Sequence, residues 1–290
     1  MTETIRPRRS ALFLPASNPK ALAKARELAA DVVILDLEDA VAPEQKVEAR
    51  AAAVAAVHEG GFGRRELVVR ANAIITPWGP DDLTALAVVG PDAVLVPKVS
   101  SPAEVRAYDA ALAAAPAHTR LWIMIETCAC IPLLHQIAAC SADTRLAGFV
   151  LGTNDLAKEM RARLTPARTP FQPILTMAVT AARAHGLIVL DGVCNDFRDL
   201  AVVRAEAEQG LEFGFDGKSL IHPDQIDPVN AVFSPSADQI AWAETVVAAF
   251  AQPDNAGKGA IQAGGRMVEL LHLEQAQRVL SVARTIAENT

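Results

Sequence analysis

The chain has 290 residues, of which 51% are apolar and 21% are charged, so it can bury a substantial core in one large domain or two small ones. A net charge of −7 argues against nucleic-acid binding, and no apolar run reaches the 18 or more residues of a membrane span. The first ten residues lack the apolar stretch of a secretory signal, and four cysteines do not form a disulfide framework in a chain this long. Together these features predict a cytoplasmic protein that binds neither nucleic acid nor a membrane.

Eight strand-like apolar runs follow one another along the first three quarters of the chain. They are SALFLP (10–15), VVILDL (32–37), ELVVRAN (66–72), AVLVPK (93–98), LWIMIE (121–126), AGFVLG (147–152), GLIVLD (186–191) and LEFGFD (211–216). Alanine-rich stretches with helical spacing separate most of them, most clearly at residues 18–30 and 43–58, whereas residues 81–89 offer only a short helix. This alternation predicts an α/β fold, a (β/α)₈ TIM barrel, with a doubly wound open sheet as the alternative. No GxGxxG motif follows the first strand, which disfavours a Rossmann fold.

The pattern changes beyond about residue 228. Residues 236–252 have the spacing of an amphipathic helix, residues 253–265 form a Gly-rich connector, and residues 267–289 have the spacing of a terminal helix. We therefore expect a catalytic barrel over residues 1–228 and a helical extension over residues 229–290. The extension either packs on its own barrel or serves as a lid, which could cover the site of a neighbouring subunit.

Polar groups collect where the predicted strands end, which is where a barrel of this type places its chemistry. Pro15 ends the first run, and the polar groups at or after the other ends are Asp36, Glu38, Asp39, Arg70, Asn72, Lys98, Glu126, Asp155, Asp191, Asp216 and Lys218. Any one of them is equally well explained as part of a solvated loop. As a set they indicate a functional site.

Glu126 and Asp155 follow two neighbouring strands and can converge on a hard divalent cation. Mg²⁺ prefers oxygen ligands at ~2.0–2.1 Å and keeps several waters, which leaves room for a substrate. This favours a metal enzyme over a binding module, although two solvated rim charges are the simpler alternative. Arg70 is the candidate substrate clamp, because a guanidinium can hold a carboxylate through two hydrogen bonds. An ion pair of Arg70 with Glu126 or Glu38 is also open.

The DLED segment places three carboxylates, Asp36, Glu38 and Asp39, within four residues. Close like charges raise one another's pKa and can hold a proton, so Glu38 or Asp39 could act in catalysis or position a water. Asp36 could instead accept hydrogen bonds from loop amides. Lys98 could balance this negative charge.

Other candidate groups have simpler explanations. Lys20 and Lys24 could meet phosphates, or they could form a solvated helix face. His222 could be a base or a loop anchor. Cys128 and Cys130 lack further ligands at zinc spacing and are better explained as small buried side chains. The chain has no GxSxG elbow and no P-loop, so serine hydrolysis and nucleotide hydrolysis are not indicated.

Several long segments in the same order resemble the citrate lyase β-subunit-like family, the CoA-ester lyases within the larger HpcH/HpaI aldolase group. The segments are RSALFLPASNPKALAKA, DVVILDLEDAVAPEQK, VVRANAIITPWGPDDL, VLVPKV, IMIET, LGTNDLAKEM, DGVCNDFRD, GFDGKSLIHPDQI and GKGAIQAGGRMVELLHLEQAQRVL. The resemblance implies a (β/α)₈ barrel with a C-terminal helical extension, assembled as a homotrimer or hexamer. It also implies Mg²⁺ on Glu126 and Asp155, a CoA-thioester substrate on Arg70, and malyl-, citramalyl- or citryl-thioester chemistry. Some members hydrolyse malyl-CoA instead. Glu126 and Lys24 are our further candidates for substrate binding.

The chain departs from the family pattern at three places. The family carries an aspartate on the C-terminal segment, in a Met-Ile-Asp pattern, which handles a proton in the adjacent subunit's site. This chain has Met267, Val268 and Glu269 there. The extra methylene moves the carboxyl group by ~1–1.5 Å, a shift that can cost ~10²-fold in rate. Cys128–Cys130 and Cys194 also differ from the usual residues near the mouth and could alter substrate choice.

The residues and the resemblance together predict a Mg²⁺-dependent lyase. It would cleave or form the C–C bond of a short 3-hydroxydicarboxylyl-CoA thioester, giving a 2-oxo acid and an acyl-CoA. The alternatives are a thioesterase on the same scaffold, a citrate-lyase-type β subunit that requires an acyl carrier protein, and a silent binding protein. Retained Glu126, Asp155 and Arg70 argue against the last.

Overall fold

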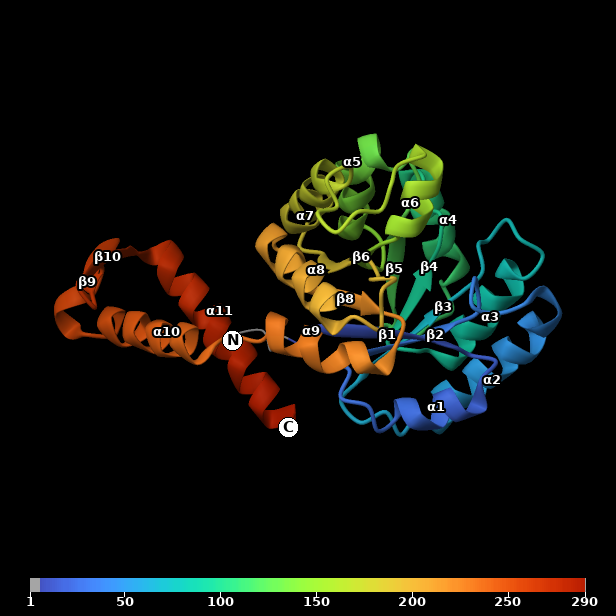
Figure 1. The fold of residues 1–290 in the computed structure, drawn as a ribbon, viewed down its shortest axis with the longest axis horizontal. Coiled ribbons are helices and arrows are strands. Elements are labelled where there is room, and N and C mark those ends of the chain that lie inside the picture. The colour runs from blue at the N-terminus through green and yellow to red at the C-terminus, as the bar shows by residue number, and fades with distance from the viewer. Residues whose placement is uncertain (1–5, 290) are drawn as a thin grey trace. The chain divides into compact units, whose positions relative to one another are not determined.

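The computed structural model describes residues 6–289, and its centre is a closed barrel of eight parallel strands with the helices outside (Figure 1). The strands are β1 (Ser10–Pro15), β2 (Val32–Asp36), β3 (Glu66–Arg70), β4 (Ala93–Val96), β5 (Arg120–Ile125), β6 (Leu146–Leu151), β7 (Ile188–Asp191) and β8 (Gly217–Leu220). Each strand pairs with the next, and β1 pairs with β8 to close the sheet. The predicted TIM barrel is confirmed, and the open sheet is excluded.

Helices cover the barrel wall in chain order. They are α1 (Pro19–Ala25), α2 (Lys46–Glu59), α3 (Gly79–Val89), α4 (Pro102–Ala111), α5 (Leu134–Ala139), α6 (Thr153–Met160), α7 (Gln172–Ala184), α8 (Leu200–Phe213) and α9 (Ile226–Phe233). Single 3₁₀ turns lie at Pro43–Gln45, Ile131–Leu133, Cys140–Ala142, Pro223–Gln225 and Pro253–Asn255. Capping side chains set several starts: Ser101 caps α4 and Asn18 caps α1, each followed by a proline that loses no helical hydrogen bond there.

Side chains fill the barrel interior, because alternate residues of each strand point inward. Trp122 and Met124 of β5 meet Val32 and Ile34 of β2 in one buried apolar cluster. The charged residues of the site lie at or directly after the ends of the strands that form this cluster. The wall of the site is therefore built on rigid elements.

The predicted eighth strand at residues 211–216 is wrong. Residues 211–213 form the last turn of α8, which Gly214 ends in a left-handed conformation with φ of +93°. The strand lies four residues further on and contains Lys218, whose side chain is fully buried. A charged residue inside the strand hides it from a search for apolar runs.

The chain divides into two compact units, residues 8–230 and residues 231–289 together with residues 6 and 7. The second unit contains α10 (Ala237–Phe250), β9 (Ala260–Ala263), β10 (Arg266–Glu269) and α11 (Leu270–Asn289). Its core joins Ala243 and Val246 of α10 to Val268 of β10 and Ala276 of α11. None of the described helices is both long and apolar enough to cross a bilayer.

The prediction of a connector over residues 253–265 is wrong in its second half. Residues 260–269 form an antiparallel hairpin whose turn, Gly264 and Gly265, has positive φ at both positions. The terminal helix consequently begins at Leu270 rather than at residue 267. Glu269 therefore lies at the end of a strand and not in the helix.

Candidate active site

A cavity of about 380 Å³ opens at the C-terminal ends of the barrel strands. Its walls include Phe13, Leu14, Pro15, Asp36, Asp39, Ala40, Arg70, Met124, Glu126, Leu151, Gly152, Thr153, Asn154, Asp155, Val193, Ser219 and Ile221. Five of the charged residues singled out in the sequence therefore line one cavity. Its remaining wall is largely apolar, which lowers the local dielectric and strengthens the electrostatics of the charged groups.

Glu126 follows β5 directly and is almost fully buried, whereas Asp155 lies in the first turn of α6 with about a third of its side chain exposed. One oxygen of Glu126, Oε1, accepts a hydrogen bond from the backbone N–H of Lys98 at 2.7 Å. The other carboxylate oxygen, Oε2, lies against Gly152. A side chain at residue 152 would collide with it, because its Cβ would lie 2.5 Å from Glu126 Oε2. Burial, with Glu38 and Asp155 nearby, raises the pKa of Glu126 to about 8.

This donor set fits Mg²⁺. Within residues 6–289 no group of three or more His, Cys, Asp or Glu side chains is arranged to hold a metal ion. Glu126 and Asp155, two carboxylates that line the same cavity, are the candidate ligands. Mg²⁺ is commonly held by one or two carboxylates and completes its shell with water and substrate oxygens. A buried carboxylate with a raised pKa gains most from a nearby cation. These two residues could therefore hold Mg²⁺.

Arg70, the last residue of β3, is held by Asp36 of β2. Its Nε and Nη2 donate to Asp36 Oδ1 and Oδ2, both at 2.6 Å, and its Nη1 lies 2.8 Å from Glu38 Oε2. Burial disfavours the guanidinium charge, but hydrogen bonds to Asp36 and the charges of Asp36 and Glu38 outweigh it and raise the pKa of Arg70. Asp36 occupies the Nε edge of the guanidinium. The Nη1/Nη2 end of the guanidinium is turned away from Asp36 Oδ1, although Nη1 also faces Glu38.

Of the two ion pairs considered for Arg70, the one with Glu38 forms. Asp36 also accepts hydrogen bonds from the loop N–H groups of Glu38 and Ala40, as predicted. Its pairing with Arg70 was missed. The parallel register places Asp36 beside Arg70 on adjacent strands, a signal that becomes visible only once the two strands are aligned.

Lys98 supplies the predicted counter-charge. Its Nζ lies 3.3 Å from Glu38 Oε1 and 3.6 Å from Asp155 Oδ1, and its backbone has φ of +56°. Burial raises the pKa of Glu38, while the charge of Arg70 opposes that effect. Asp39 is more exposed, and its Oδ2 lies 3.9 Å from Arg70 Nη1. Glu38 is consequently the better placed of the two to hold a proton.

Glu38 and Lys98 contact the wall residues Arg70 and Asp155 but do not themselves line the cavity. Three further candidates also lie outside its wall. Lys24 is exposed on α1, and Glu269 is exposed on β10 in the second unit. His222 caps a 3₁₀ turn through its Nδ1, which accepts from the backbone N–H of Asp224, and its ring stacks on Phe197. The structure therefore supports the loop-anchor interpretation of His222.

Two strand-end residues belong to a separate buried network. Lys218 Nζ donates to Asp191 Oδ2 at 3.1 Å, and Arg168 Nη1 donates to both Asp191 oxygens. Asp191 and Lys218 are fully buried. The predicted buried cysteine is confirmed for Cys130, but Cys128 is exposed.

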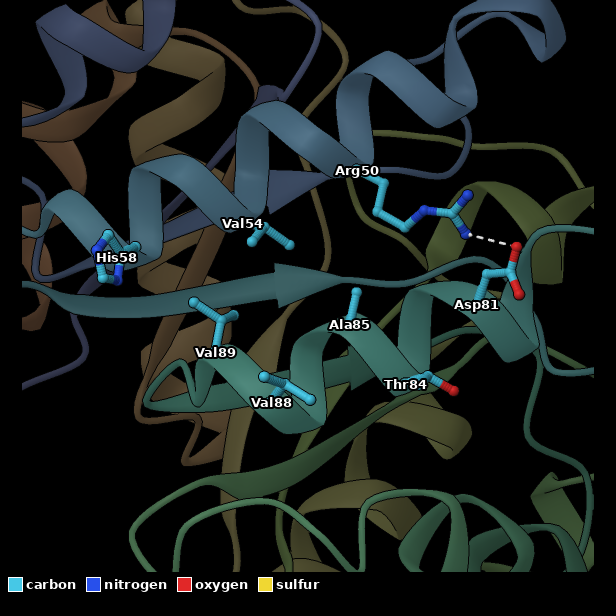
Figure 2. Close-up of a pocket in the computed structure, with 8 residues that line it drawn as sticks. All are labelled: Arg50, Val54, His58, Asp81, Thr84, Ala85, Val88 and Val89. Atoms are coloured by element: carbon cyan, nitrogen blue, oxygen red, sulfur yellow. Dashed lines mark ion pairs between the residues drawn. The ribbon is translucent and has the colours of Figure 1, made fainter.

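A larger cavity of about 650 Å³ lies between the outer helices α2 and α3 (Figure 2). Val54, Ala85 and Val89 form its apolar floor, and Arg50 of α2 points toward Asp81 of α3 at 3.3 Å. The strand-end carboxylates do not line it. We therefore place the candidate active site at the barrel mouth despite the smaller volume there.

Comparisons with known proteins agree with this geometry. Residues 9–223 match the HpcH/HpaI aldolase/citrate lyase family. The chain is 45% identical to a (3S)-malyl-CoA thioesterase of Cereibacter sphaeroides, covering 99% of this chain and 98% of that protein. It is 34% identical to an L-malyl-CoA/beta-methylmalyl-CoA lyase of the same species, covering 97% and 96%. The crystal structure of CitE from Mycobacterium tuberculosis with magnesium, acetoacetate and coenzyme A is 32% identical with a TM-score of 0.77, covering 97% of this chain and 100% of that one.

Proposed function

This chain belongs to the HpcH/HpaI aldolase/citrate lyase family, and from that premise we propose that it is a Mg²⁺-dependent enzyme that hydrolyses a malyl-CoA-type thioester. The observation that carries the proposal is the convergence of Glu126, Asp155 and Arg70 on one cavity at the barrel mouth. The 45% sequence identity to a malyl-CoA thioesterase, over 99% of this chain, supports hydrolysis ahead of C–C cleavage.

Each charged residue has a defined task in this proposal. Glu126 and Asp155 would hold Mg²⁺, which when bound stabilises negative charge developing on a substrate oxygen. Arg70 orients the substrate carboxylate through its Nη1/Nη2 end. Glu38 takes a proton from the attacking water, whose oxygen forms a bond to the thioester carbon as the C–S bond breaks. The departing CoA sulfur receives the proton that Glu38 took from the water, and a free hydroxy acid remains.

The lyase is the second candidate, supported by the 34% identity to the malyl-CoA/methylmalyl-CoA lyase. In that reaction a base removes the proton of the 3-hydroxyl group, and the C–C bond breaks to give a 2-oxo acid and a thioester enolate. The enolate carbon must then be protonated. Glu269 replaces the aspartate that the family pattern places on the C-terminal segment for this step, and it carries one methylene more.

Product analysis separates the two reactions. We expect purified protein with Mg²⁺ and malyl-CoA to release free CoA and intact malate, because hydrolysis breaks only the C–S bond, and EDTA should abolish this release. Chromatography of the acids and CoA species, with citramalyl- and citryl-CoA as further substrates, makes the measurement. A 2-oxo acid with acetyl-CoA would identify the lyase instead. Turnover only on an acyl carrier protein would indicate the carrier-dependent β subunit.

Glu269→Asp tests the C-terminal segment. If the extra methylene keeps this carboxyl group from the enolate carbon, the shorter side chain should raise the cleavage-to-hydrolysis product ratio, by up to ~10²-fold for a shift of about 1 Å. Glu274→Asp, the same change at an exposed position of α11, is the matched control and should leave the ratio unchanged. An unaltered ratio in Glu269→Asp would remove Glu269 from proton handling.

We further propose that the protein is a homotrimer or hexamer in which Glu269 serves the site of a neighbouring subunit. Mixing Glu126→Ala subunits with Glu269→Ala subunits tests this arrangement. Neither homo-oligomer should release the products of C–C cleavage, but mixed oligomers should recover part of that cleavage activity, because some sites then combine an intact Glu126 with a neighbour's intact Glu269. If mixing recovers nothing while co-purification of differently tagged subunits confirms mixed oligomers, each site uses its own Glu269.

A further inference from the structure

The backbone just before the Glu38 side chain is held by two buried polar side chains. Lys46 is the first residue of α2 and only 6% exposed, and its Nζ donates to the carbonyl oxygens of Leu37 at 2.8 Å and of Glu38 at 2.7 Å. Asn72, which follows β3, donates from Nδ2 to the same Leu37 oxygen at 2.9 Å. Leu37 and Glu38 therefore have both carbonyl groups fixed by side chains from separate elements.

The N–H groups of these two residues are fixed as well. The Leu37 N–H donates to the Arg70 carbonyl oxygen at 2.9 Å, and the Glu38 N–H donates to Asp36 Oδ1 at 2.9 Å. All four backbone polar groups of the Leu37–Glu38 pair thus have partners. The direction in which the Glu38 side chain leaves the backbone is set by this bonding.

The support continues outward to the helical layer. Asp82 of α3 is fully buried, and its Oδ2 accepts hydrogen bonds from the backbone N–H and the Nδ2 of Asn72 at 3.0 and 2.7 Å. Arg50, one turn after Lys46 on α2, lies with its Nη1 3.3 Å from the other oxygen of Asp82. Arg50 also pairs with Asp81 of α3, the ion pair drawn between α2 and α3 in Figure 2.

Burying an ammonium group is costly, and an apolar side chain of similar length could fill the same space. A lysine at residue 46 therefore has a reason beyond packing. One of the two residues whose backbone Lys46 binds is Glu38, the proposed base. The Glu38 carboxylate lies 2.8 Å from Arg70 Nη1 and 3.3 Å from Lys98 Nζ. A displacement of about 1 Å in such a group can cost ~10²-fold in rate.

We propose that Lys46 is a positioning residue that, together with Asn72, holds the Glu38 carboxylate between Arg70 and Lys98. This inference rests on the proposed function, in which Glu38 takes the proton of the attacking water. Lys46 acts only through the backbone of residues 37 and 38. It does not line the cavity at the barrel mouth.

A double-mutant cycle tests the inference. Lys46→Met should lower kcat by ~10- to 10²-fold while KM changes little, because the substrate contacts of Arg70 remain. Added to Glu38→Gln, it should lower kcat no further, because the residue it positions has already lost its function. If the two losses multiply, or if Lys46→Met keeps the wild-type kcat, the inference is overturned. If Glu38→Gln itself keeps the wild-type rate, the role of Glu38 in the proposed function fails, which is a separate outcome.

Arg26→Met is the matched control for losing a cation on the same helical layer. Arg26 Nε donates to the carbonyl oxygen of Gly60 at 2.9 Å at the far end of α2, and its guanidinium stacks on Phe62. Lys46 similarly binds carbonyl oxygens and lies over Trp78. We expect Arg26→Met to reduce thermal stability but to keep kcat, and a kcat loss equal to that of Lys46→Met would overturn the inference.

Asn72→Ala provides a second route if Lys46→Met does not fold. It removes one of the two donors to the Leu37 oxygen and leaves Lys46 in place. We expect a smaller kcat loss that also disappears in the Glu38→Gln background. A loss of equal size in both backgrounds would show that Asn72 acts elsewhere, against the inference.

Discussion

Replacing Glu126 with glutamine should abolish Mg²⁺-dependent turnover, by ~10³-fold or more, while the barrel remains folded. One of two carboxylates able to hold the metal is lost, and the Lewis-acid contribution of a metal is worth several kcal/mol. Glutamine fills the same volume and can still accept a hydrogen bond from the Lys98 N–H. A steady-state assay with varied Mg²⁺ measures the loss, with exposed Glu208→Gln on α8 as the control. Wild-type turnover in Glu126→Gln would contradict the metal assignment.

The same substitution should have an opposite, pH-dependent effect on the stability of the metal-free protein. Burial raises the pKa of Glu126 to about 8 from an ordinary value of 4.5. The folded protein therefore binds this proton more tightly than the unfolded chain does. The stability it contributes is complete below pH 4.5 and is lost as the pH rises through about 8, by up to roughly 5 kcal/mol. In EDTA, Glu126→Gln should melt above the wild type at pH 9 and not at pH 4. Equal differences at both pH values would contradict this.

Arg70→Met should remove both activity and much of the stability. It leaves Asp36, which is 1% exposed, without its bidentate partner, and an uncompensated buried charge costs ~3–5 kcal/mol. Chemical denaturation and turnover assays measure the two losses separately.

A second substitution separates the two roles of Arg70. Adding Asp36→Asn to Arg70→Met removes the stranded charge and should restore most of the stability, because the asparagine oxygen can still accept from the Glu38 N–H. Activity should stay absent, since no guanidinium remains to orient the substrate. A double variant that regains turnover would show that Arg70 has only a structural role.

The barrel could be predicted because seven of its eight strands are almost purely apolar, and their ends carry the charged groups that line the mouth. The eighth could not, because β8 places fully buried Lys218 in the strand itself. The apolar run at residues 211–216, of which residues 211–213 lie in α8, took its place in the prediction. The hairpin at residues 260–269 was missed for a related reason. Its strands alternate exposed and buried residues over only four positions each, and its two turn glycines resemble a linker.

The chemical groups of the site could be read from the sequence, but most of their pairings could not. Pairing of Asp36 with Arg70 depends on the register of β2 against β3, and that of Lys98 with Asp155 joins residues 57 positions apart. Gly152 at a strand end is a sign of close approach, yet the sequence does not say that the approaching group is Glu126. Nothing in the sequence distinguishes Lys46 from the other charged residues of α2, a helix rich in alanine. The local sequence pattern thus identifies which residues belong to the site, whereas their pairings depend on tertiary contacts.

Closure of the sheet by β1 and β8 also sets a minimum waiting time during synthesis. Ser10 pairs with Lys218, so the first strand leaves the ribosome about 200 residues before its partner. At ~5–20 residues per second, that interval is roughly 10–40 s. Throughout this interval the edge of β1 that later pairs with β8 has unpaired backbone N–H and C=O groups. A nascent chain of this protein therefore presents an open strand edge for tens of seconds, and a chaperone that shields residues 10–15 would act in that window.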